Sequence, residues 1–189
     1  MFAHRLSRSA RSVVFRARDI AQSGGRRFIG PDHILLALME RHPELFEGLS
    51  SHPIDLQSLQ REVAQLTTAS DVSREAVKLR FNEQSKRVLQ VAAQEARSCW
   101  ERWEAPRRKR GQMLAEDQKY WEVRLRQPIR TGKLPQWIMR WMLRRTWEID
   151  ERHLFLGLLR GAEYPGVAAL TKQGVTLEGA RQRLCATEG

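Results

Sequence analysis

Two stretches of this chain, residues 29–39 and 149–159, are apolar on every side and share one order of residues. Each starts with an isoleucine and a capping residue, Gly30 or Asp150, and each has a histidine three places after that residue. A helix that is apolar all round must be surrounded by protein. The pattern therefore predicts two buried helices that belong to an internal repeat.

An amphipathic helix is predicted before each buried helix, because apolar or small residues recur there at one helical spacing. The first set is Ala10, Val13, Val14, Ala17 and Ala21, and the second is Ser85, Val88, Leu89, Ala92 and Ala96. A helical turn and a last amphipathic helix follow each buried helix, with Ser7 and Asp55 as predicted caps in the first half.

The fold class predicted from these patterns is all-α, a double repeat of about four helices each. We expect one domain over residues 1–189, with a first repeat at 4–66, a linker at 67–80 and a second repeat at 81–186. The offset between the repeats rises from 75 to 120 residues after the first helix of the second repeat. A helical insertion of residues 97–147 accounts for this jump.

The predicted insertion differs from the repeats in composition. It contains all six tryptophans, and it has 14 basic and 5 acidic residues, which is +9 of the chain's net charge of +11. Within it, Trp137 and Trp141 share one helical face and Arg140 and Arg144 share another, so these four are candidate partner-binding residues. Four interpretations stay open: helices packed on the domain, a protein-docking surface, a membrane-surface helix and a nucleic-acid-binding element.

Targeting and compartment signals are few. No apolar run approaches the about 18 residues that a membrane span requires. The Arg- and Ser-rich start could be an organelle presequence, but the same residues fit the first helix of the repeat. Cys99 and Cys185 form no CxxC motif or disulfide framework, which fits a reducing interior, and we expect a cytoplasmic location.

Motifs for catalysis, metals or cofactors are not evident in the sequence. His33 and His153 stand at helix starts, which favours structural hydrogen bonds over metal ligation or catalysis. Gly132-Lys133 lacks the earlier glycine and the following Ser or Thr of a nucleotide-binding loop. We therefore predict no enzymatic activity and no cofactor.

The repeated motif resembles the Clp N-terminal repeat domain, which stands at the front of unfoldases of the ClpA, ClpB and ClpC types. Residues 29–38 and, more divergently, 149–158 match the family's buried-helix motif, and Leu6-Ser7 and Phe81-Asn82 match its helix-opening Phe-Thr. The resemblance covers residues 4–66, 81–96 and 148–186, and the insertion is not part of it.

The resemblance implies a pseudo-twofold all-α domain that docks substrates or adaptor proteins. In ClpC-type domains it also implies recognition of phosphorylated arginine, in which the acidic residue before the motif histidine pairs with the guanidinium. Asp32 retains that acid, one methylene shorter, whereas the second copy has Arg152. Asp32 is therefore also a candidate partner-binding residue.

The function we expect is non-catalytic protein binding in a Clp-type protease or chaperone system, as an adaptor, client-docking protein or modulator. The expected partners are Clp ATPase or protease subunits, adaptors or clients. The alternative is a nucleic-acid or anionic-surface binding protein that uses the basic, tryptophan-rich insertion. The sequence sets no oligomeric state.

Overall fold

The computed structural model describes residues 5–50, 53–67, 79–104 and 147–185. The chain divides into two compact units, residues 1–96 together with 148–189, and residues 97–147. The first unit holds both copies of the repeated motif. The boundaries assigned to the linker and to the two repeats stay predictions.

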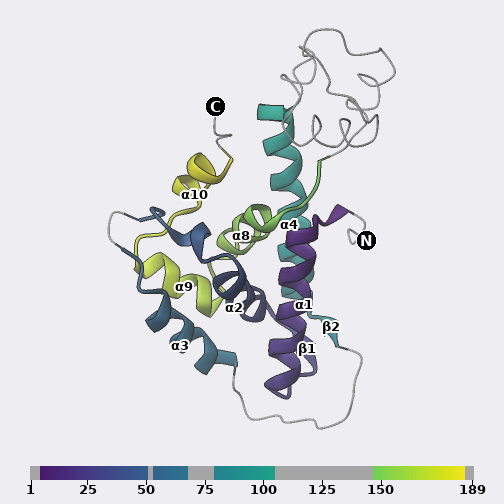
Figure 1. The fold of residues 1–189 in the computed structure, drawn as a ribbon, viewed down its shortest axis with the longest axis vertical. Helices are drawn as coiled ribbons and strands as arrows, with labels where there is room; N and C mark the ends of the chain where they lie inside the picture. Colours follow the sequence, from purple (N-terminus) through teal and green to yellow (C-terminus); the bar gives the residue numbers. More distant parts are fainter. Residues whose placement is uncertain (1–4, 51–52, 68–78, 105–146, 186–189) are drawn as a thin grey trace, which may run out of the picture. The chain divides into compact units, whose positions relative to one another are not determined.

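The described part of the first unit is built from helices, as the sequence predicts (Figure 1). In the first half these are α1 (Arg8–Ser23), α2 (Pro31–Arg41), the 3-10 turn η2 (Pro43–Phe46) and α3 (Leu56–Thr67). In the second half they are α4 (Glu83–Cys99), α8 (Glu151–Leu159), α9 (Pro165–Lys172) and α10 (Leu177–Leu184).

Side-chain caps set where the amphipathic helices begin. Ser7 Oγ accepts the Ala10 N–H at 3.1 Å, and Asp55 Oδ1 accepts the Ser58 N–H at 3.0 Å, at the two caps that the sequence predicts. Asn82 Oδ1 and Thr176 Oγ1 do the same for α4 and α10. Local sequence therefore fixes the starts of these helices.

Short parallel backbone pairings interlock the two repeats, and the sequence patterns did not predict them. Strand β1 (Phe28–Ile29), just before α2, pairs with β2 (Arg80–Phe81), just before α4. In the matching place, Leu6 bridges Ile149, where the Ser7 N–H donates to the Ile149 carbonyl at 2.9 Å. The residues that open one repeat thus pair with those that precede the buried helix of the other.

The core is shared between the repeats. Helices α2 and α8 lie together at the centre of the unit, flanked by α1, α3 and α9 (Figure 1). The rings of Phe46 and Phe155, one from each repeat, meet edge to face with their centroids 5.0 Å apart. The predicted buried helices are confirmed, because seven residues of α8 and eight of α2 are buried.

In the second unit, the structure describes the end of α4, the π-helical turn η3 (Trp100–Glu104) and Trp147.

Cys99 and Cys185 are both disulfide-bonded. The interpretation that the two cysteines form no disulfide framework and fit a reducing interior is therefore wrong. Because disulfides are rare in cytosolic proteins, the cysteines no longer support the expected cytoplasmic location, which stays a prediction.

Candidate functional site

The first copy of the motif borders a cavity of about 450 Å³ in the first unit. It lies at the start of α2, where Gly30 is the cap and Pro31 the first helical residue. The end of α3 and the start of α4 complete it. Its lining residues are Arg26, Arg27, Phe28, Gly30, Pro31, Asp32, His33, Thr67, Asn82 and Gln84.

His33 closes the first turn of α2 and leaves one ring nitrogen unsatisfied. Its Nδ1 accepts the Gly30 N–H at 3.0 Å, which confirms the predicted structural hydrogen bond. The side chain is 6% exposed, and its Nε2 is buried with no hydrogen-bond partner. Burial, reinforced by the positive charge of Arg26, lowers the pKa of His33, so the ring is neutral at pH 7. With Nδ1 as acceptor, the proton of the neutral ring belongs on Nε2.

Asp32 links the two repeats through a hydrogen bond. Its Oδ1 accepts the N–H of Gly166, in the first turn of α9, at 3.1 Å. Asp32 thus satisfies a backbone donor that a helix start leaves open. Burial raises the pKa of Asp32, while the Gly166 hydrogen bond and Arg26 act in the opposite direction.

Arg26 and Arg27 add positive charge to the same cavity. The Arg26 Nε donates to the Thr67 carbonyl at 2.6 Å, which fixes this guanidinium against the end of α3. Arg27 and Phe28 are exposed at the cavity, and Phe28 is 54% exposed, one of two large exposed apolar side chains in the described residues.

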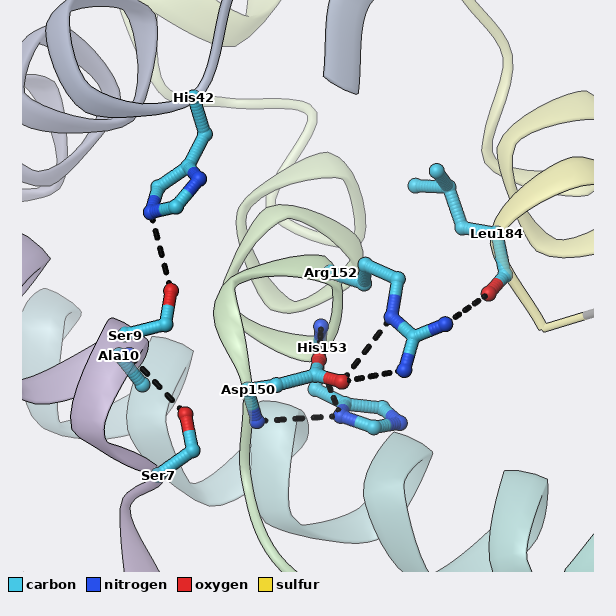
Figure 2. A network of polar contacts seen from close by, with 8 residues as sticks. All are labelled: Ser7, Ser9, Ala10, His42, Asp150, Arg152, His153 and Leu184. Carbon is cyan, nitrogen blue, oxygen red and sulfur yellow. Dashed lines mark hydrogen bonds and ion pairs between the residues drawn. The ribbon is translucent and has the colours of Figure 1, made fainter. Parts of the chain in front are cut away.

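The second copy of the motif has different chemistry. His153 Nδ1 lies 3.2 Å from the Asp150 backbone N and 2.7 Å from Asp150 Oδ1 (Figure 2). Arg152 donates to the other oxygen of Asp150 from Nε and Nη2, and to the Leu184 carbonyl at 3.5 Å (Figure 2). Burial alone would raise the pKa of Asp150, but His153 and Arg152 lower it well below its usual range. The carboxylate of Asp150 is therefore paired within the fold, with the Arg152 guanidinium.

Near the second motif, Ser9, His42 and Glu44 form a chain of hydrogen bonds that the sequence did not indicate. Ser9 Oγ lies 2.9 Å from His42 Nε2, and His42 Nδ1 lies 2.8 Å from Glu44 Oε1 (Figure 2 shows the first). This order is that of a serine hydrolase relay. Neither cavity described in the structure includes Ser9, so we interpret the chain as a clamp between α1 and η2.

A profile of the Clp repeat (R) N-terminal domain family matches residues 5–102. The chain belongs to the Clp N-terminal domain family. The match includes α1, the first motif with its cavity, and α4. The resemblance inferred from the repeated motif is therefore confirmed.

Two solved structures share the Clp N-terminal domain fold with this chain. The N-terminal domain of the caseinolytic-protease-associated chaperone ClpD from Arabidopsis thaliana is 16% identical, with a TM-score of 0.52 and 97% of each chain covered. A structure from "Preliminary structural investigations of a malarial protein secretion system" is 15% identical, with a TM-score of 0.58, covering 95% of this chain and 92% of that one. At these identities the likeness shows the fold alone. No match was found among curated proteins.

Family membership supports a general protein-binding role in a Clp system. Of the five predicted partner-binding residues, Asp32 lines the cavity. The other four, Trp137, Arg140, Trp141 and Arg144, lie outside the described residues, so their role stays a prediction.

Among the described residues, no cluster that could hold a metal ion is found, and no helix is long and apolar enough to cross a membrane.

Sequence reasoning missed Arg26, Arg27 and Asn82 as cavity residues. Each lies outside the buried-helix motif and in an ordinary polar context, and the β1–β2 pairing brings Asn82 beside residues 26–30. The family's helix-opening signature at Phe81-Asn82 was the one signal that could have indicated its place.

Proposed function

We propose that this protein is a non-catalytic docking module of a Clp-type protease or chaperone system, and that it binds client or adaptor proteins at the cavity beside α2. The observation that carries the proposal is the cavity itself. It is lined by an exposed Arg27, an exposed Phe28 and His33, whose Nε2 is buried and has no hydrogen-bond partner. Arg and aromatic side chains are frequent anchors of protein interfaces.

The form of the cavity favours a peptide segment over a small molecule. Its lining mixes charged, amide and apolar groups from three parts of the chain, residues 26–33, Thr67 and residues 82–84. A protruding client side chain could enter beside Phe28 while its backbone remains outside. Docking of this kind requires no covalent chemistry from the chain.

The test is affinity capture with purified wild-type protein, with the captured proteins identified by mass spectrometry. We expect Clp ATPase or protease subunits, or their clients, to be enriched over capture by an Arg27→Ala variant. An Arg18→Ala variant is the matched control, because Arg18 is exposed on α1 and lies outside the cavity. Equal capture by all three proteins would count against docking at the cavity.

The second candidate function is binding to nucleic acid or another anionic surface. The observation that favours it is the concentration of charge, +9, in residues 97–147. Binding to a single-stranded oligonucleotide that falls steeply with salt, together with no Clp protein in the capture experiment, would support this alternative.

A further inference from the structure

The polar groups of the cavity beside α2 are mostly hydrogen-bond donors. The neutral His33 ring has its remaining proton on Nε2, buried and without an acceptor. Asn82 uses its Oδ1 to accept the Ser85 N–H at 2.8 Å, so its amide nitrogen is the group left to face a ligand. That nitrogen lies 3.7 Å from where a Cβ at Gly30 would stand, next to the His33 ring.

Positive charge accompanies these donors. Both Arg26 and Arg27 line the cavity, and the field of Arg26 reaches Asp32 and His33, whose pKa values it lowers. The start of α2 adds the partial positive charge of a helix N-terminus. A buried donor without an acceptor is costly, so an incoming oxygen anion would satisfy the His33 Nε2–H and face the exposed Arg27.

Among the described residues that line the cavity, Asp32 is the one acid, and it already accepts a hydrogen bond within the fold. Asp32 Oδ1 accepts the Gly166 N–H at the start of α9, so a guanidinium that paired with both oxygens of Asp32 would have to share Oδ1 with this N–H. Burial raises the pKa of Asp32, while the Gly166 hydrogen bond acts in the opposite direction. The bidentate pairing that a guanidinium prefers needs both carboxylate oxygens. The cavity therefore favours anions over guanidinium groups.

We propose that this cavity binds the carboxylate of an acidic side chain in a client segment, held by the Arg27 guanidinium, the Asn82 amide and the His33 Nε2–H. This inference rests on the proposed docking function and adds the chemical class of the ligand. Phe28, exposed beside Arg27, provides an apolar surface for the client residue next to the acid.

The probe is a short fluorescein-labelled peptide that combines glutamates with one phenylalanine, titrated with the full chain by fluorescence anisotropy. Matched peptides replace each Glu with Gln or with Arg, and a third carries phosphoserine in place of one Glu. We expect the glutamate peptide to bind at least about tenfold more tightly than the Gln and Arg peptides, because one charged hydrogen bond is worth about that factor, and at least as tightly as the phosphoserine peptide. Its affinity should fall as salt rises.

Two cavity variants and one control separate a specific site from general charge. Arg27→Ala should weaken the glutamate peptide about tenfold, whereas Arg18→Ala, which removes the same charge from α1, should leave it within about twofold. His33→Glu retains an acceptor for the Gly30 N–H but removes the donor and adds repulsion, so binding should be lost while the helical circular dichroism is retained. In wild type, the ¹⁵N shift of His33 Nε2 should change on binding.

Tighter binding of the arginine or phosphoserine peptide would overturn the carboxylate assignment. So would equal losses in Arg27→Ala and Arg18→Ala, or a His33 Nε2 signal that does not respond. If the wild-type protein captures Clp proteins in an Arg27-dependent way but binds no glutamate peptide, this inference fails and the proposed docking function stands. If both the capture and the peptide binding are absent, both fail.

Discussion

In each buried helix, the Nδ1 of the histidine at the third position lies within hydrogen-bond distance of the backbone nitrogen of the cap. The residues next to the histidine determine whether its surroundings are charged. In the first copy the cap is Gly30, which has no side chain to pair with His33; burial and Arg26 lower the pKa of His33, and its Nε2 has no partner. In the second copy Asp150 lies against His153 and Arg152. One motif thus gives one open site and one site whose charges are paired internally.

Replacing Asp32 separates its structural role from its charge. Because folding raises the pKa of Asp32, the stabilising form is the protonated one, present below about pH 4 and lost as pH rises. Asp32→Asn keeps an oxygen for the Gly166 N–H, so we expect it to be at least as stable as wild type at neutral pH. Asp32→Ala loses the acceptor and should cost about 1 kcal/mol. Urea unfolding of both variants measures this, and equal destabilisation by Asn and Ala would contradict it.

Asp150 should make the opposite contribution to pH dependence. Its pKa is lowered in the folded state, so its stabilisation is present above about pH 4 and is lost as pH falls. Asp150→Asn keeps a good helix cap but loses the pairing with His153 and Arg152, and should cost about 1 kcal/mol at neutral pH. As pH falls below about 4, the difference in unfolding free energy between wild type and variant should shrink progressively in a pH series of urea unfolding curves. A constant difference across the series would refute the assignment.

At the scale of elements, the contact between α4 and α8 depends on a glycine. A Cβ at Gly157 would stand 2.6 Å from the Val88 carbonyl oxygen and 3.1 Å from the Ala92 nitrogen. Both atoms belong to the backbone of α4 and cannot move away without shifting the helix. The matching position in α2 is Ala37, so the first repeat accommodates the methyl group that the second excludes.

Gly157→Ala should therefore destabilise the protein, although Ala is usually the better helix former. We expect a net cost of about 1–3 kcal/mol, as for other overpacked cores. The matched variant Ala37→Gly should lose only about 1 kcal/mol, mainly through helix propensity. Thermal unfolding of both would measure the difference, and a Gly157→Ala protein more stable than wild type would show that α4 and α8 can separate.

The helices were predictable because their signals are local. The caps Ser7, Asp55 and Asp150 and the continuous apolar runs each lie within a few residues of the element that they define. The strands β1 and β2 were not, since two-residue strands have no periodicity. In the candidate site, Asp32 was predicted, but its partner Gly166 is 134 residues away, and no local pattern joins them.

At the scale of the molecule, the pairings between repeats make the first unit one folding unit. The backbone bridges, the Asp32–Gly166 hydrogen bond and the Phe46–Phe155 contact each join one repeat to the other. Neither repeat could separate without exposing the apolar faces of α2 and α8. Such a unit is expected to unfold as a whole.

Leu36→Ala and Leu156→Ala test this shared core, because both side chains are buried, one in each repeat. Each should cost about 2–5 kcal/mol. In both variants, calorimetry should show the two repeats unfolding in one transition at a lower temperature. A variant in which one repeat melts separately while the other keeps its wild-type transition would contradict a shared core.

The most direct test of the docking account is the affinity of a captured Clp partner for the chain, measured by calorimetry with defined variants. The account predicts that Arg27→Ala weakens this partner about tenfold and that Arg18→Ala leaves it unchanged. A double Trp137→Ala/Trp141→Ala variant reports on the insertion in the same experiment. Binding that is unaffected by Arg27→Ala but lost in the double tryptophan variant would contradict docking at the cavity and place the partner on the insertion.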